Sequence, residues 1–258
     1  MLGFFIKKAF FDGWDHLFSI VLLNAGFVAI IAFGILVPPL LGPAGGVFVL
    51  LAVGLALLAG SVWFSAGVHA MKAVADFGQF GWKDLFAALK SGFLPGLQLG
   101  GIAAAVLLSL RVGLPFYLAR GGFVGAIAAG LLLWIGLVLL LALQWYLPLR
   151  ARLGGGFVKN LKKSLVLFFD NGLFSVFLLG YNLVGLALSF FLAFLVPGPA
   201  GIALALDDAL RLRLYKYDWL EANPGADRKR VPWDELLAED RELVGKRTLK
   251  GMIFPWKE

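Results

Sequence analysis

Residues 17–68 read LFSIVLLNAGFVAIIAFGILVPPLLGPAGGVFVLLAVGLALLAGSVWFSAGV, and this stretch decides the fold. It contains two uncharged apolar runs, 17–37 and 47–68, separated by a segment with three prolines. A helix needs about 20 apolar residues to cross the hydrocarbon core of a bilayer. Proline ends or bends a helix because it lacks the backbone donor. The stretch therefore predicts two membrane-spanning helices joined by a short turn.

The rest of the chain extends this pattern. Of its 258 residues, 60% are hydrophobic and 15% are charged, whereas about a quarter are charged in a typical soluble domain. Further apolar runs at 93–110, 121–149 and 172–196 predict three more spans, and a sixth, shorter span is predicted from 199 to about 217. The predicted fold class is thus an all-α membrane protein with six transmembrane helices. Five full spans and a short interfacial helix remain the alternative.

Basic residues are distributed unevenly between the predicted loops. The segments on one side carry two, three and five of them, whereas the segment between the third and fourth spans carries Arg111 and Arg120. Cytoplasmic loops are enriched in Lys and Arg, so the N-terminus is predicted to be cytoplasmic, and six spans would return the tail to the same side. The predicted basic contacts with the membrane surface are Arg150, Arg152, Lys159, Lys162 and Lys163.

Two domains and an internal repeat follow from this arrangement. Residues 1–217 are predicted to form the membrane domain, and residues 218–258 a charged cytoplasmic tail with a short helix. Amphipathic stretches that suit interfacial helices begin at residues 6, 82 and 158, at intervals of 76 residues, each before a long apolar run. These intervals suggest three repeated helical hairpins, and chance similarity between apolar segments is the alternative.

Polar residues inside the apolar runs are the candidate functional residues. Asp207, Asp208 and Arg211 follow a proline-containing break, as at the substrate or proton sites of transporters with interrupted helices. The structural interpretation is an Asp207–Arg211 ion pair at the end of a short helix. Asn182 and Gln144 are further intramembrane candidates, for which hydrogen bonds between helices are the structural interpretation.

Few other residues suit chemistry. His16 and His69 are weak metal-binding candidates, because no HExxH spacing accompanies them. The chain has no cysteine and no Walker-type glycine loop, and its serines lack a neighbouring base. We therefore predict no enzymatic activity, no cofactor and no nucleic-acid partner. The pair Gly96 and Gly100 predicts close packing of helix backbones.

Several motifs resemble the YesL-like family of uncharacterised bacterial membrane proteins. They are KAFFDGWDHL (8–17), PPLLGPAG (38–45), WKDLFAALKSGF (82–93), QWYLPLRARLGGGFVKNLKKSL (144–165) and PGPAGIALALDDAL (197–210). The resemblance covers about residues 4–213 and implies a helical protein of the bacterial inner membrane, often found beside carbohydrate ABC-transporter systems. It implies no catalytic residues.

Three functional hypotheses result. The first is an accessory or scaffold subunit of a membrane complex, whose partners are the lipid bilayer and subunits of an ABC transporter or another membrane complex. The second is an independent transporter of small solutes or ions that uses the broken last helix. A membrane enzyme is the third, and no catalytic constellation supports it.

Overall fold

The described part of the chain, residues 1–228 and 230–248 of a computed structural model, is helical and contains no strand. Its first half consists of α1 (Leu2–Asp15), α2 (Leu17–Leu41), the 3₁₀ turn η1 (Gly42–Ala44), α3 (Gly46–Ala75) and α4 (Trp82–Arg120). The second half consists of α5 (Gly122–Leu143), α6 (Tyr146–Leu153), α7 (Phe157–Asp170), α8 (Gly172–Phe191), α9 (Gly198–Ala222), α10 (Trp233–Leu236) and α11 (Ala238–Val244).

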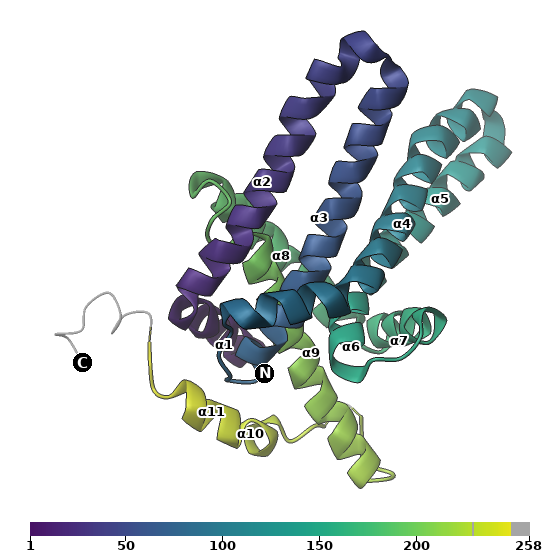
Figure 1. Ribbon diagram of the computed structural model, residues 1–258. Helices are drawn as coiled ribbons and strands as arrows, with labels where there is room; N and C mark the ends of the chain where they lie inside the picture. Colours follow the sequence, from purple (N-terminus) through teal and green to yellow (C-terminus); the bar gives the residue numbers. More distant parts are fainter. Residues whose placement is uncertain (229, 249–258) are drawn as a thin grey trace.

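Two long hairpins, α2–α3 and α4–α5, extend from one end of the molecule (Figure 1). Their far ends carry large apolar side chains that no other element covers. Leu40 is 77% exposed, Leu50 is 73% exposed and Phe123 is 80% exposed. Apolar surface of this extent on both hairpins is unfavourable in water and suits the hydrocarbon core of a bilayer.

The two hairpins are joined where α3 packs against α4. Gly92 and Gly96 lie so close to α3 that an added Cβ would be 2.8 Å from the Ala66 nitrogen and 2.5 Å from the Val62 Cα, respectively. A Cβ on Gly100 would be 2.9 Å from Ser61 Oγ. The predicted role of Gly96 and Gly100 in close helix packing is therefore confirmed.

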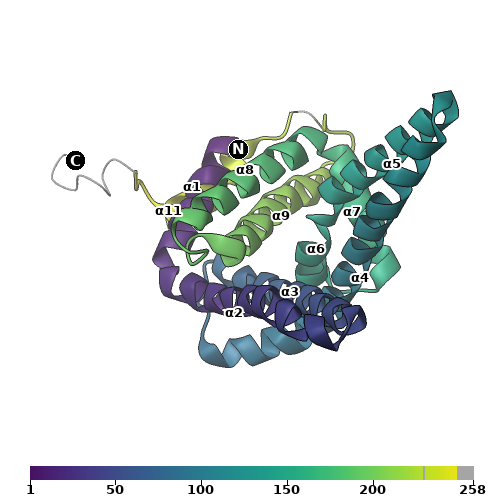
Figure 2. The ribbon, with the colours of Figure 1, turned by 90° about the horizontal axis from the view of Figure 1, so that it is seen from above.

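The amphipathic stretches form helices at the base of the hairpins. One residue separates α1 from α2, and one separates α7 from α8. The stretch that begins at residue 82 is instead the first part of α4, which is continuous to Arg120 and contains Pro95. In both views this first part runs across the end of α3 before the helix rises beside α5 (Figures 1 and 2).

Five helical segments are long and apolar enough to cross a membrane. They are Leu17–Leu41, Gly46–Ala75, Lys83–Arg120, Gly122–Leu153 and Gly172–Phe191. The sixth predicted span lies in α9, which is not among them because its second half carries several charged residues. The helix is nevertheless continuous from Gly198 to Ala222, so the break precedes it, in residues 192–197.

Helix α9 is the buried centre of the fold. It contacts α1, α2, α3, α6 and α8, which lie around it in the view from above (Figure 2). Ala203, Leu210 and Leu212 are among its fully buried apolar side chains. Beyond α9, the short helices α10 and α11 lead back to α1, where Lys7 donates a hydrogen bond to the carbonyl of Gly245 (2.7 Å). Residues 229 and 249–258 of the predicted tail lie outside the described residues.

Candidate functional site

The acidic pair of α9 lies in a cluster of charged side chains from five parts of the fold. We call this cluster the α9 ion-pair network. Its members are Lys8, Asp12, Asp76, Arg152, Asp207, Asp208, Arg211 and Asp240. They come from α1, the end of α3, α6, α9 and α11.

Lys8 pairs with Asp208 at the α1 side of the network. Its ammonium is 3.1 Å from Asp208 Oδ1, and it donates a hydrogen bond to the Asp12 carboxylate one turn along α1. The lysine side chain is completely buried, with the ring of Phe77 3.9 Å from its nitrogen. Removal of a charge from water costs free energy that only a close opposite charge can offset. The pairing of Lys8 with Asp208 therefore fixes the position of α1 on α9.

Arg152 pairs with Asp207 at the α6 side. Arg152 Nε is 3.2 Å from Asp207 Oδ1, and its Nη1 is 2.9 Å from Asp76 Oδ1 at the end of α3. The carboxylate oxygens of Asp207 and Asp208 have no hydrogen-bond partner among the described residues, so their contacts with the cations are ion pairs without hydrogen-bond geometry. Arg152 was predicted at the membrane surface, but its side chain is only 9% exposed because it turns inward to these two carboxylates.

The predicted ion pair between Asp207 and Arg211 does not form. Arg211 instead contacts Asp76 (2.6 Å) and Asp240 of α11 (2.9 Å). Asp207 is completely buried, whereas the Arg211 side chain reaches the surface at the end of α3 and meets the returning tail. Both residues are part of the network, but Arg211 connects α9 to the tail rather than to Asp207.

The environments of the carboxylates outside the apolar segments shift their pKa values in opposite directions. Burial raises the pKa of Asp12, and the adjacent Lys8 offsets only part of this effect. Burial also acts to raise the pKa of Asp76, but hydrogen bonds and charges from Arg152 and Arg211 hold it below its ordinary value. At the end of α7, Tyr217 and Lys216 likewise lower the pKa of Asp170 against the effect of burial.

The other candidates do not join the network. Gln144 donates hydrogen bonds to the carbonyls of Leu141 (2.8 Å) and Ser175 (3.0 Å), which links the end of α5 to α8. Asn182 is buried on α8, and no described residue is a hydrogen-bond partner of its Oδ1.

Each of the two histidines contacts a backbone carbonyl four residues earlier in the chain. His16 Nδ1 is 3.0 Å from the carbonyl of Asp12, and His69 Nδ1 is 2.8 Å from the carbonyl of Ser65. Within residues 1–228 and 230–248, no group of three or more histidine or acidic side chains is placed to hold a metal ion. Each histidine therefore bonds within its own helix end.

Two of the three lysines predicted at the membrane surface are more exposed than the predicted arginines that precede them in the chain. Lys159 and Lys162 are exposed on α7, and Lys163 is half-buried. Arg150 donates a hydrogen bond to the carbonyl of Gly155, closing the loop between α6 and α7. Basic groups thus lie along α7, where an interfacial helix would present them to anionic headgroups.

Four members of the network, Lys8, Asp12, Asp76 and Asp240, were not identified as candidate site residues from the sequence. Lys8, Asp12 and Asp76 precede α9 by well over one hundred residues, so their distance along the chain conceals their contact with it. The Lys8–Asp12 spacing of four residues was an available signal, because such pairs share a helix face.

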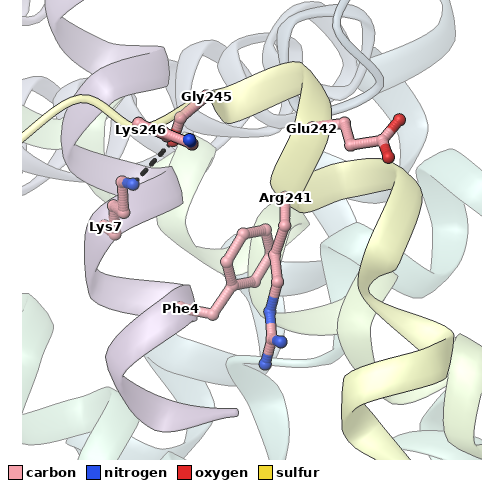
Figure 3. A pocket seen from close by; sticks show the side chains of 6 residues that line it. All are labelled: Phe4, Lys7, Arg241, Glu242, Gly245 and Lys246. Carbon is pink, nitrogen blue, oxygen red and sulfur yellow. Dashed lines mark hydrogen bonds between the residues drawn. The ribbon is translucent and has the colours of Figure 1, made fainter.

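Two cavities flank α1. One, of about 600 Å³, lies between α1, α8 and α9 and is mainly apolar, with Asn182 among its lining residues. The other, of about 570 Å³, is lined by Phe4 and Lys7 of α1 and by Arg241, Glu242, Gly245 and Lys246 of the tail (Figure 3).

The fold and its surface indicate the class of protein. Five helices of membrane-spanning length and the exposed apolar hairpins indicate a multi-pass membrane protein. Comparison with protein-family models, with curated proteins and with solved structures finds no match in any of the three.

Proposed function

We propose that the chain is a multi-pass protein of the bacterial inner membrane and acts as an accessory or scaffold subunit of a membrane complex, such as a carbohydrate uptake system. The observation that carries the scaffold role is the α9 ion-pair network, which ties α1, the base of the long hairpins and the tail to one buried helix. The bacterial membrane and the carbohydrate context rest on the resemblance to the YesL-like family.

The contacts of the tail support a topology in which both ends lie on one side. Arg247 pairs with Asp15 at the end of α1 (2.7 Å), and Lys7 bonds to Gly245. Helix α1 and the tail can touch only if the chain between them crosses the membrane an even number of times. Five complete crossings would separate them. The excess of basic residues near α1 and α7 supports a cytoplasmic location for this side.

The depth of the α8–α9 hairpin favours four complete crossings over six. Its turn is held by Asn24, which donates hydrogen bonds to the carbonyls of Leu195 (3.0 Å) and Pro197 (2.8 Å). Asn24 lies about 10 Å along α2 from Leu17, at 1.5 Å per residue. The apolar part of α9, residues 198–206, extends only about 13 Å at the same rise, whereas the hydrocarbon core is about 30 Å thick. In our proposal α8 and α9 enter the membrane from the cytoplasmic side and return to it.

The repeated architecture remains part of the proposal. Both α1 and α7 contain 14 residues, end one residue before an apolar helix, and precede a hairpin. Their linking residues also bond alike, since His16 contacts the Asp12 carbonyl and Asn171 donates to the Leu167 carbonyl. This correspondence supports repeated units of an interfacial helix and a hairpin.

The position of the acidic pair argues against the transporter alternative. Arg152 connects Asp207 to Asp76, which caps the end of α3, so the pair lies at the level of the helix ends. Transporter sites of the broken-helix type lie near the middle of the bilayer. If Asp207 nevertheless carries protons or solutes, flux through reconstituted protein will change in Asp207→Asn.

Capture of partners from native membranes tests the scaffold role. A photoreactive amino acid replaces Trp134, which is exposed on α5, and in a second variant replaces Lys162 on α7. We expect at least one position to crosslink to a defined membrane protein, and the band to disappear when that partner is deleted. Crosslinks to lipid alone at both positions, with a purified protein that runs as a single species, would contradict the proposal.

A further inference from the structure

The apolar cavity beside α1 has the size and lining of a ligand site. Its volume of about 600 Å³ lies within the range of pockets that enclose small molecules. Apolar side chains from α1, α2, α8 and α9 dominate its wall, among them Ile6, Phe10, Trp14, Val184, Leu188 and Ile202. Asn182 supplies a polar group in this wall: it is 8% exposed, and its Oδ1 lacks a hydrogen-bond partner among the described residues.

One end of this cavity is basic. Lys7 and Arg247 line it, and Lys7 also lines the neighbouring cavity together with Lys246. Figure 3 shows the Lys7 and Lys246 side chains on the same side of the tail, whereas Glu242 points away from them. Arg247 is paired with Asp15, but neither Lys7 nor Lys246 forms an ion pair within residues 1–228 and 230–248. Lys7 thus lines both cavities, and in the neighbouring cavity Lys246 supplies a second ammonium group that forms no ion pair with the described residues.

The surroundings of the cavity are those of a membrane interface. Phe10 stacks on Trp14 with ring centroids 6.2 Å apart, and Trp14 is 49% exposed. Tryptophan is enriched at the boundary between headgroups and hydrocarbon. On the α8 side, Val184 and Leu188 line the cavity and are also exposed, so the cavity continues into the outer apolar face of that helix.

We propose that this cavity binds one anionic phospholipid. An acyl chain occupies the apolar space between α1, α8 and α9, and the phosphate lies against Lys7 and Lys246. The unpartnered Oδ1 of Asn182 accepts a hydrogen bond from a hydroxyl group of the same lipid. A basic residue near the membrane surface favours an anionic lipid by about 1 kcal/mol, or about fivefold, and two lysines act together here.

Selective retention of lipid tests the proposal. The full-length chain is reconstituted in nanodiscs with equal amounts of phosphatidylglycerol and phosphatidylcholine, released, and analysed by native mass spectrometry. We expect one phosphatidylglycerol to be retained at least about fivefold more often than phosphatidylcholine. Equal retention of the two lipids would overturn the proposal. If inorganic phosphate alone raises the melting temperature as much as phosphatidylglycerol does, the site binds free phosphate and the lipid proposal is wrong.

Two pairs of variants separate the charge from the cavity. The double variant Lys7→Gln/Lys246→Gln should abolish the preference for phosphatidylglycerol, and Lys162→Gln on α7 should keep it. Gly185 lines the cavity, and a Cβ there would make only an ordinary contact with Pro197 Cγ (3.6 Å), so Gly185→Leu should fill part of the cavity and lose the lipid. Gly180→Leu is the matched control on α8, since a Cβ there meets nothing within 4 Å. Unchanged lipid retention in both Lys7→Gln/Lys246→Gln and Gly185→Leu would refute the site.

Discussion

Lys8 is a buried cation that is shared by two buried carboxylates. It is fully buried between the carboxylates of Asp12 and Asp208 and against the ring of Phe77. A buried ion pair stabilises little compared with an apolar packing of the same shape, but removal of one member leaves an uncompensated charge. The residue therefore specifies how α1 docks more than it adds to overall stability.

The substitution Lys8→Met should destabilise the fold by about 3–5 kcal/mol, because Asp208 and Asp12 lose their shared cation. Chemical denaturation in detergent micelles measures this change. Lys8→Met/Asp208→Leu should recover part of the loss, because it removes one of the stranded carboxylates. Lys83→Met, at an exposed lysine, should behave like the unsubstituted chain. A Lys8→Met variant of unchanged stability would show that the buried pair does not form.

The carboxylates predict a stability maximum at mildly acidic pH. The pKa of Asp12 is raised above its ordinary value of 3.8, so the folded state binds more protons there, and the free energy of unfolding should rise as the pH falls from neutral. The pKa values of Asp76 and Asp170 are lowered, so their contribution is lost as the pH falls below 3.8. Melting temperatures measured from pH 7 to pH 3 check this profile. Asp12→Asn should remove the rise, and a steady decline from pH 7 would contradict the assignment.

At the scale of the elements, the contact between α3 and α4 depends on glycine. A Cβ at position 96 would lie 2.5 Å from the Val62 Cα, so the helices must separate to accept it. Gly96→Ala should therefore cost about 1–3 kcal/mol, as overpacking does. Gly101→Ala is the control on the same helix, because a Cβ there meets nothing, and it should be neutral or slightly stabilising. Equal melting temperatures of Gly96→Ala and Gly101→Ala would contradict the close packing of α3 on α4.

The sequence predicted the positions of the helices along the chain far better than how deeply each helix is buried in the fold. Apolar runs and prolines were sufficient to locate the helices, since the length of an uncharged run sets what can cross a bilayer. The role of α9 was harder to predict from the sequence. Its composition predicts a short last span, yet its acidic pair Asp207 and Asp208 is buried against side chains from α1 and α6. Asp207 was predicted to pair with a residue on its own helix, because helix periodicity can be read from the sequence. It pairs instead with Arg152, which only the tertiary fold brings near.

At the scale of the whole molecule, the topology is accessible to labelling because the chain has no cysteine. We expect Lys83→Cys and Glu221→Cys to react only from the cytoplasmic side, and Arg120→Cys, at the turn between α4 and α5, only from the opposite side. A membrane-impermeant maleimide applied to intact spheroplasts and to inverted vesicles makes the measurement. Reaction of positions 83 and 221 from opposite sides would rule out the even number of crossings.

The burial of α9 also constrains the order of events during synthesis. Asp208 follows its partner Lys8 by 200 residues, a delay of roughly 10–40 s at typical rates of translation. Until then, the first helix and both long hairpins emerge without the helix that holds them together. A ribosome that stalls before residue 198 would leave Lys8 and Arg152 without Asp208 and Asp207. Such a nascent chain would be more open to membrane proteases than the complete fold, so the synthesis of α9 is the step that protects the earlier helices.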